Sequence, residues 1–400
     1  MSEWKQYKLG DLCLRITKGT TPTKGQGFVA NGINFIKSES IGTNGRIDKS
    51  RFAFIDEKTH YKLKRSWLQE KDILFSMAGV YLAKSAIVTS DMLPANTNQA
   101  LAIIRINQEI ALPKYINYYL MQNSIVAYVN NMSGQSAQPN VNFQEIASIS
   151  VLLPSIPEQK AIAKLLSSLD DKIDLLHRQN KTLEAMAETL FRQWFVEVEK
   201  DGWEEKRLGE VLSLIESGSR PKGGIDPDLK TGIPSVGAEN INGIGQYDYS
   251  KTKFVTEEFF KSMRRGTIQD YDVLIYKDGA YVGRKGMFGH NYPYDICTIN
   301  EHVFILRSSD RLNQIFLYFL VQEDDLAQLN ANSAQPGLNQ EAMRSFEIII
   351  PPKPLIDEFA NMVKPGIDKI FFNAKQIRTL EKLRDTLLPK LMSGEVRVAV

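Results

Sequence analysis

The longest regular pattern of apolar positions lies between residues 157 and 200. Apolar side chains recur there every seven residues, and a second series follows the first at a spacing of four. The first series is Ile162, Leu169, Leu176, Leu183 and Leu190, and the second is Leu166, Ile173, Asn180, Ala187 and Trp194. This heptad pattern predicts one long helix that begins near Pro157-Glu158, where a proline is tolerated, and meets no Gly or Pro before Gly202. At about 1.5 Å per residue, roughly 40 helical residues form a rod of about 60 Å.

A second helical pattern occupies the end of the chain. Its apolar positions are Phe359, Val363, Ile370, Ile377, Leu380 and Leu387. We expect Lys364-Pro365-Gly366 to kink or break this helix into a short and a longer piece, and we expect it to stop around residues 388–394. Sustained heptads favour antiparallel pairing of the two helices within one chain over two amphipathic helices that each pack only on their own domain. Asn180 and Asn373 would then lie near the seam, where they either set the register or face water.

Short β-like runs and turn residues precede each helical pattern. Ala100–Arg105 and His302–Arg307 have the length of strands and are apolar enough to be buried. Each region closes on an apolar run that ends in proline. The pattern therefore predicts an α+β fold in which two mixed α/β domains are separated by two long antiparallel coiled-coil helices. The predicted segments are a first domain at 1–153, a first helical region at 154–200, a second domain at 201–351, and a second helical region with a tail at 352–400.

The two predicted domains repeat each other at an offset of about 200 residues. Trp4-Lys-Gln-Tyr-Lys-Leu-Gly10-Asp-Leu reappears as Trp203-Glu-Glu-Lys-Arg-Leu-Gly209-Glu-Val. A collinear series then pairs Gly32 with Gly232, Glu39 with Glu239, Arg65 with Arg265, Asp72 with Asp272, Gly79 with Gly279 and Lys84 with Arg284, and Ser136–Pro139 later matches Ser333–Pro336. Shared composition does not produce such a series, so we infer an internal duplication with an approximate twofold axis.

Composition and charge set only loose limits. Hydrophobic residues make up 43% and charged residues 24% of the 400-residue chain, as in ordinary soluble proteins, and no run approaches the roughly 18 apolar residues of a membrane span. Cys13 and Cys297 are the only cysteines, which excludes a disulfide framework or a Cys-rich zinc site and makes a reducing cytoplasm the simplest location. With a net charge of +2, a nucleic-acid-binding chain must concentrate its Lys and Arg on one face.

A search for catalytic groups finds no constellation. The four histidines have no metal-ligand spacing, and no phosphate-binding Gly-x-x-x-x-Gly-Lys-Ser/Thr is present. Asn291-Tyr-Pro-Tyr294 is similar to the Asn-Pro-Pro-Tyr motif of adenine methyltransferases, but Tyr replaces the first Pro and no Gly-rich cofactor-binding turn accompanies it. We interpret it as a surface turn, and we expect no catalytic residue, no metal and no cofactor in this chain.

Several loops combine Lys or Arg with small polar side chains, which are the groups that contact DNA phosphates and base edges. The candidates in the first domain are Lys18, Thr20, Thr21, Lys24, Lys84, Ser133 and Gln135. Those in the second are Ser219, Arg220, Lys222, Lys277, Tyr281, Arg284, Lys285 and Asn332. The alternative is that these are solvated turns. Positions that differ between the repeats, such as Thr21 and Arg220, are the better candidates for base readout, because two half-sites generally differ in sequence.

The order of these motifs resembles that of the specificity subunits of Type I restriction–modification systems over essentially the whole chain. The resemblance rests on the repeated Trp…Leu-Gly starts, on the Gly19-Thr-Thr-Pro22 and Gly218-Ser-Arg-Pro221 loops, on Leu153-Pro154-Ser-Ile-Pro157-Glu158-Gln159, and on Leu387-Leu-Pro389-Lys390-Leu-Met-Ser393-Gly394. Each motif is weak alone, but their order in a duplicated frame is specific.

The resemblance implies a non-catalytic subunit with two target-recognition domains, each of which reads one half of a bipartite DNA sequence. The helices would set the gap and bind two methyltransferase subunits, which use S-adenosylmethionine to modify adenine N6. Two further subunits would carry ATP- and Mg²⁺-dependent translocation and cleavage. Two alternatives stay open: a coiled-coil scaffold whose duplicated domains bind proteins, and a duplicated enzyme, which the missing catalytic constellation disfavours.

Overall fold

The computed structural model describes residues 4–23, 27–42, 44–132, 140–321, 326 and 337–399. The chain divides into two compact units, each made of one globular domain and parts of both long helices. The first unit comprises Met1–Asp171 and Lys382–Val400, and the second comprises Lys172–Glu381. Among the helices described in this structure, none is long and apolar enough to cross a membrane.

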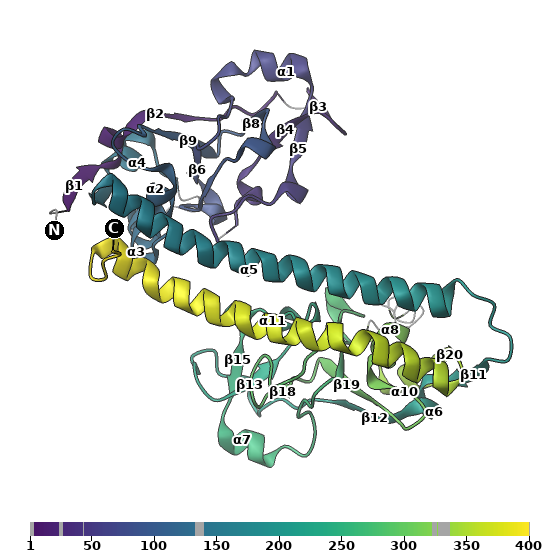
Figure 1. Ribbon diagram of the computed structural model, residues 1–400. Helices are drawn as coiled ribbons and strands as arrows, with labels where there is room; N and C mark the ends of the chain where they lie inside the picture. The colour runs from purple at the N-terminus through teal and green to yellow at the C-terminus, as the bar shows by residue number, and fades with distance from the viewer. Residues whose placement is uncertain are drawn as a thin grey trace. The chain divides into compact units, whose positions relative to one another are not determined.

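The first unit contains two sheets and a two-stranded ribbon (Figure 1). One sheet has the order β2-β9-β6-β7, with β2 at Cys13–Lys18, β9 at Leu101–Ile106, β6 at Ile73–Ser76 and β7 at Ser85–Ile87. The other has the order β3-β5-β4-β8, with β3 at Phe28–Val29, β5 at Ala53–Ile55, β4 at Ile33–Ile36 and β8 at Ala95–Thr97. The ribbon pairs β1 (Lys5–Lys8) antiparallel with β10 (Ser150–Leu153). The short helices are α1 (Glu57–Lys62), α2 (Pro113–Leu120), α3 (Asn123–Met132) and α4 (Phe143–Ser148).

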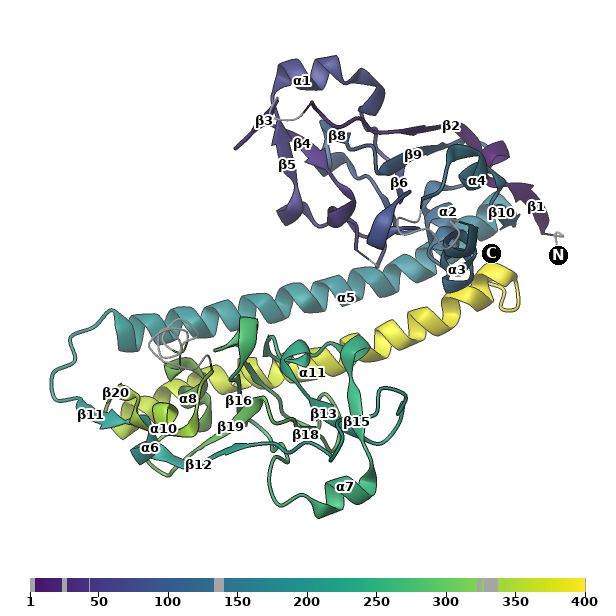
Figure 2. The same ribbon diagram turned by 180° about the vertical axis from the view of Figure 1, so that it is seen from behind.

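The second unit has a closely matching set of strands (Figure 2). Its larger sheet has the order β12-β19-β16-β17-β14, with β12 at Leu212–Ser217, β19 at Val303–Ser308, β16 at Val273–Tyr276, β17 at Lys285–Met287 and β14 at Gly243–Ile244. The smaller sheet has the order β15-β13-β18, with β15 at Lys253–Val255, β13 at Ile233–Val236 and β18 at Thr298–Ile299. The ribbon pairs β11 (Glu204–Arg207) with β20 (Glu347–Ile350). The short helices are α6 (Leu208–Val211), α7 (Glu257–Ser262), α8 (Gln314–Leu320) and α10 (Gln340–Ser345).

In each unit we call the sheet with the longer strands the larger sheet, which is β2-β9-β6-β7 in the first unit and β12-β19-β16-β17-β14 in the second. One interior strand of each larger sheet is buried on both faces, which explains its continuous apolar run. Along β9, Ile104 packs into one hydrophobic cluster and its neighbour Ile103 packs into another. Along β19, Phe304 and Ile305 divide in the same way. Successive side chains of a strand point to opposite faces, so each larger sheet separates two cores. The mixed sheets and the paired helices confirm the predicted α+β fold.

The two long helices are α5 (Ile156–Phe191) and α11 (Lys353–Ser393), which run alongside each other in Figures 1 and 2. In the first unit, Ile162 near the start of α5 shares a hydrophobic cluster with Leu391 near the end of α11. In the second unit, Phe191 at the end of α5 lies 5.8 Å from Phe359 near the start of α11, measured between ring centroids. Within each unit, therefore, the helix segments are antiparallel.

The predicted division of this helix into two pieces at Lys364-Pro365-Gly366 is wrong, because α11 is helical throughout Lys353–Ser393. Proline removes one backbone hydrogen bond, but buried side chains on both sides of it hold the segment in helical register. Val363 precedes Pro365 and Ile367 follows Gly366, and both are almost fully buried in the main core of the second unit. The predicted end is confirmed, since Ser393 is the last helical residue and Gly394 has a φ of 77°, as a helix-terminating glycine often does.

Asn180 and Asn373 lie at the seam between the helices. The Asn373 side-chain amide donates a 2.8 Å hydrogen bond to the Asn180 side-chain oxygen, and Asn373 is fully buried. A buried amide pair at one level of a helix seam disfavours other registers, because any slip would leave both amides without a partner. Of the two readings of the sequence, the seam position is the observed one.

Candidate nucleic-acid interface

Each domain presents a tight loop between two adjacent strands of its larger sheet, which we call the tip loop. In the first domain it connects β6 to β7 and contains Gly79–Lys84. The Ser76 N–H donates to the Lys84 carbonyl at 2.8 Å, and the Ala83 N–H donates to the Ser76 carbonyl at 2.9 Å. Gly79 has a φ of 70°, and no other atom lies within 4 Å of the position its Cβ would take, so the backbone conformation is what requires glycine there.

The second domain repeats this loop between β16 and β17, at residues 279–284. The Tyr276 N–H donates to the Arg284 carbonyl at 2.8 Å, and the Gly283 N–H donates to the Tyr276 carbonyl at 2.9 Å. Gly279 has a φ of 66°. The two loops therefore share one backbone design, and their differences lie in the side chains that they carry.

A cation lies over a tyrosine ring in both tip loops. The Lys84 Nζ is 4.6 Å from the centroid of the Tyr81 ring, and the Arg284 guanidinium carbon is 4.0 Å from that of Tyr281. Tyr281 is about half exposed. Cation–π stacking of this kind favours one orientation of the cation. Lys84 and Arg284 are both half-buried.

Sequence reasoning named Tyr281 but missed Tyr81. The signal was available, because Tyr81 and Tyr281 lie at the constant offset of 200 residues. Tyr81 follows Val80, whose side chain is 90% exposed, and only the stacking geometry with Lys84 distinguishes Tyr81 from an ordinary surface residue.

The Gly-rich loops near Gly19 and Gly218 owe their repeated glycines to packing. A Cβ on Gly19 would lie 2.1 Å from the Thr97 carbonyl oxygen, and one on Gly218 would lie 1.9 Å from the Ile299 carbonyl oxygen. The side chains that follow these glycines differ between the two repeats. Thr20 is half-buried and Thr21 is exposed, whereas Arg220 is exposed and forms a 3.5 Å ion pair with Glu301.

The other predicted residues fall into two groups. Lys18 and Lys222 are exposed, and Ser219 and Lys277 are half-buried. The Lys277 Nζ lies 5.1 Å from the centroid of the Phe304 ring. Lys24, Ser133, Gln135 and Asn332 lie outside the described residues, as do the repeated Ser136–Pro139 and Ser333–Pro336 segments.

Lys285 is not available for DNA, which corrects its place among the candidates. Its side chain is 9% exposed. The ammonium donates to the Tyr318 and Val321 carbonyl oxygens at 2.9 and 3.0 Å, at the C-terminal end of α8. The adjacent Arg284 is half-buried, and the alternation of side chains along the strand turns Lys285 to the opposite, fully buried side.

The Asn291–Tyr294 turn is also more buried than expected. Tyr292 is 6% exposed and packs against Phe288 and Tyr249 at centroid distances of 6.0 and 6.4 Å. Tyr294, which stands where the motif has its tyrosine, is half-buried and packs against Tyr247 and Tyr249 at centroid distances of 5.8 and 5.6 Å. Burial raises the pKa of Cys13 and of Cys297 to about 12, so neither thiol is a ready thiolate nucleophile.

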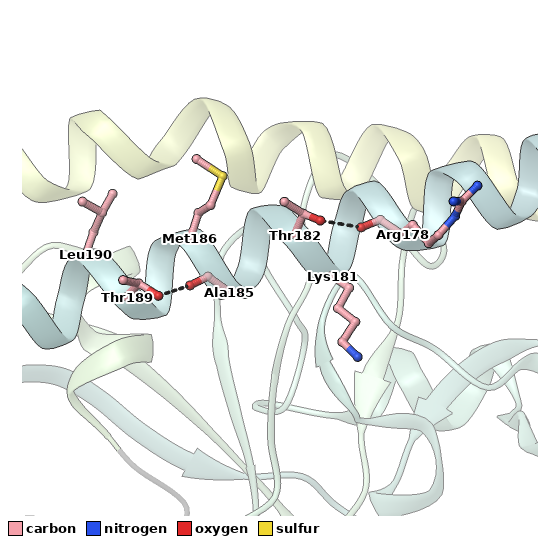
Figure 3. A pocket seen from close by; sticks show the side chains of 7 residues that line it. All are labelled: Arg178, Lys181, Thr182, Ala185, Met186, Thr189 and Leu190. Carbon is pink, nitrogen blue, oxygen red and sulfur yellow. Dashed lines mark hydrogen bonds between the residues drawn. The ribbon is translucent and has the colours of Figure 1, made fainter. Parts of the chain in front are cut away.

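The exposed face of α5 in the second unit forms a shallow hollow of about 670 Å³ (Figure 3). Its lining residues are Arg178, Lys181, Thr182, Ala185, Met186, Thr189 and Leu190. The hydroxyls of Thr182 and Thr189 donate back to the carbonyls of Arg178 and Ala185, so the face offers methyl groups rather than hydroxyls. Met186, the most exposed large apolar side chain among these residues, is 57% exposed.

Comparisons with known proteins agree on one family. The family model described as the Type I restriction modification DNA specificity domain matches residues 1–185 and again residues 200–382. The chain is 30% identical over 328 residues to the MjaIX specificity subunit of Methanocaldococcus jannaschii, covering 76% of this chain and 74% of that one. It is 21% identical over 470 residues to the HindI specificity subunit of Haemophilus influenzae, covering 99% and 100%. Its fold is similar to the crystal structure of a Type-I restriction-modification S subunit from M. genitalium, with a TM-score of 0.62 at 15% identity and coverage of 98% and 96%.

Proposed function

Because the chain belongs to the family of Type I restriction–modification DNA specificity subunits, we propose that each of its two domains reads one half of a bipartite DNA sequence through its tip loop. The observation that carries this proposal is the cation stacked on tyrosine at the same position in both loops. A stacked guanidinium donates two parallel hydrogen bonds to the O6 and N7 atoms of guanine, whereas an ammonium donates from a single point. Lys84 and Arg284 therefore suit two half-sites of different sequence.

The exposed members of the Gly-rich loops would support the same contacts. Thr21 and Arg220 occupy matching positions and differ in chemistry, as expected where two half-sites differ. Lys18, Thr20, Ser219, Lys222 and Lys277 complete the proposed set among the described residues, together with Lys24, Ser133, Gln135 and Asn332 beyond them. Lys285 is omitted because its ammonium is buried.

The tip-loop proposal is tested by removing one cation at a time. We expect Arg284→Ala in the assembled methyltransferase complex to weaken binding to the target by about 1–3 kcal/mol. Base changes in the second half-site should then weaken binding by the variant complex much less than they weaken binding by the wild-type complex, whereas base changes in the first half-site should weaken both equally. Arg284→Lys keeps the charge but loses the bidentate geometry, and Lys84→Ala serves as the matched control because it should affect only the first half-site. Equal affinity of the complex for all duplexes at physiological salt would refute sequence reading by this chain.

We further propose that the long helices set the gap between the half-sites. At about 1.5 Å per residue, the 36 residues of α5 span roughly 54 Å, which corresponds to between one and two turns of duplex DNA. Inserting four residues into either helix should change the permitted gap and leave both half-sites unchanged. The pattern of methylated adenines in the genome of cells that express the variant measures both quantities, and a changed half-site sequence would contradict the proposal.

The partners follow from this assignment. We propose that the helical regions bind two methyltransferase subunits, with the exposed α5 face around Met186 as one contact surface, and that two restriction and translocation subunits complete the enzyme. S-adenosylmethionine, ATP and Mg²⁺ would act in those partners. The complex would work in the cytoplasm.

A further inference from the structure

The two domains differ sharply at one buried position beside the tip loops. Residues 85 and 285 begin the matching strands β7 and β17, and both side chains point inward, with Ser85 at 2% and Lys285 at 9% exposure. A serine and a lysine differ by the length of a four-carbon stem and an ammonium group. Ser85 therefore does not fill the volume beside its strand that the Lys285 side chain fills in the second domain.

In the second domain, Lys285 fills a well-defined socket. Its ammonium donates to the Tyr318 and Val321 carbonyls and lies 4.4 Å from the centroid of the Tyr318 ring. Carbonyl oxygens at the C-terminal end of a helix carry partial negative charge, which suits the Lys285 ammonium. The socket thus binds an alkylammonium group within the protein itself.

The first domain has a hollow at the matching place. Counted at the same offset of 200, Tyr118 and Met121 correspond to Tyr318 and Val321, and α2 ends at Leu120 as α8 ends at Leu320. The hollow has a volume of about 480 Å³. Its lining residues include the apolar Leu82, Ala83, Met121 and Val126 and the polar Lys84, Ser85, Asn123 and Asn130. The Ser85 hydroxyl is buried and, within the described part of the chain, has no hydrogen-bond partner.

We propose that this hollow, the Ser85 socket, binds a primary alkylammonium group from outside the chain, either the side chain of a lysine on a partner subunit or a free alkylamine. The apolar lining residues would contact the methylene stem of the ligand. The Ser85 hydroxyl and the carbonyl oxygens at the end of α2 would accept hydrogen bonds from its ammonium group, so that apolar and charged parts each meet a matching surface. Lys285 shows, in the same fold, the ligand class that such a socket accepts. This inference does not depend on which bases the tip loops read.

The test uses n-butylammonium chloride, which reproduces the lysine side chain, and the full-length chain in isothermal titration calorimetry. Tetramethylammonium chloride at equal concentration controls for ionic strength, because it carries the same charge but has no N–H to donate. We expect saturable binding of one n-butylammonium per chain. Ser85→Lys should abolish this binding, since the new lysine fills the socket as Lys285 does in the second domain.

Two further variants keep the test decisive. Lys285→Ser opens the second socket and should raise the stoichiometry from one to two, which also shows that the probe recognises such sites. If Ser85→Lys fails to fold, Val126→Phe narrows the first socket from α3 and should weaken binding more than about tenfold. Absence of binding to the wild-type chain, or binding unchanged in both first-socket variants, would overturn the proposal. Binding that appears only after Lys84→Met would also overturn it, since Lys84 would then be the resident ligand.

The source of the ammonium group is separated by adding the methyltransferase partners. If a partner lysine is the ligand, assembly should displace n-butylammonium from the Ser85 socket but not from the socket opened by Lys285→Ser. If a free alkylamine is the ligand, the assembled complex should still bind one equivalent of n-butylammonium.

Discussion

The two domains of this specificity subunit keep the same packing and differ in the side chains on and beside their tip loops. Asp72 and Asp272 are both almost fully buried, and each accepts two hydrogen bonds from an arginine of the neighbouring strand. The tip loops likewise share their backbone hydrogen bonds. By contrast, Lys84 aligns with Arg284, and Ser85 aligns with Lys285, when the two repeats are compared. After the duplication the scaffold residues were therefore retained, whereas residues on and beside the tip loops diverged.

The largest effect is expected from breaking the buried aspartate–arginine pair that both domains share. Arg307→Leu should destabilise the second domain by about 3–5 kcal/mol, because it leaves the buried Asp272 carboxylate without its cation. Arg105→Leu should do the same to the first domain through Asp72. Hydrogen exchange measured by mass spectrometry reports the loss for each domain separately, which a single unfolding transition of a two-unit chain does not.

The double variant Asp272→Leu/Arg307→Leu is the control for this pair. It removes both charges, so it should be less destabilised than Arg307→Leu alone. If the single and double variants lose protection equally, the ion pair does not account for the stability of this region.

Most of the architecture could be predicted from the sequence, because it rests on repeating patterns. Heptads located both helices, and the constant offset between Gly79 and Gly279 exposed the duplication. The break expected at Pro365 failed for a physical reason: the rule for proline is local, whereas burial of Val363 and Ile367 is a tertiary effect. The sequence pattern alone does not show whether the burial of these side chains outweighs the cost of a proline within the helix.

The candidate site was predicted less well. Composition identified the loops, but it could not separate Arg284, which is half-buried and stacks on Tyr281, from Lys285, which points into the core. That distinction depends on where the strand begins, and boundaries are the least reliable part of a sequence-based assignment. The Ser85 socket was beyond sequence reasoning altogether, since it is defined by space left empty beside the end of another helix.

A smaller effect is expected where each domain contacts a long helix. Asp170 and Asp368 each lie 16 residues after the proline that closes their domain, at Pro154 and Pro352. Asp170 is 7% exposed and accepts hydrogen bonds from the Tyr118 hydroxyl at 2.5 Å and from Arg384 at 3.0 Å. Asp170→Asn should therefore cost about 2 kcal/mol, as expected for the loss of buried charge-assisted hydrogen bonds.

Asp368 is the matched control for Asp170. It accepts hydrogen bonds from Tyr271 and Lys364, but its side chain is 23% exposed and that of Lys364 is 46% exposed, so water replaces the lost contacts more easily. Asp368→Asn should cost no more than about 1 kcal/mol. Equal losses of exchange protection in the two variants would show that burial does not distinguish these contacts.

The smallest effect is a difference in pH dependence between the two contacts. Burial acts to raise the pKa of Asp368, but hydrogen bonds from Lys364, Tyr271 and His290 outweigh it, and the pKa lies below its ordinary value of 3.8. The unfolded chain then binds this proton more tightly, so the contribution of Asp368 to stability is complete above about pH 4 and is lost as the pH falls further. The hydrogen bonds to Asp368 and Tyr271 raise the pKa of Lys364 above 10.5, so its contribution is lost on the alkaline side.

Burial raises the pKa of both Tyr118 and Tyr271 above the ordinary value of 10, so each unit loses some stability as its tyrosine ionises. The first unit should lack only the part of the alkaline loss that comes from a lysine. There the cation is Arg384, which stays protonated throughout this range. The test measures exchange protection between pH 3 and pH 11, corrects it for intrinsic exchange, and compares each wild-type contact with its Asp→Asn variant. Around Asp368 the protection should fall at both ends of this range, and at the alkaline end it should fall more than it does around Asp170. Lys364→Met should reduce the alkaline fall in the second unit and leave the first unit unchanged. An alkaline fall of equal size around both aspartates would mean that the lysine and the arginine are interchangeable at this contact, and that the two units differ in recognition but not in how their domains are held to the helices.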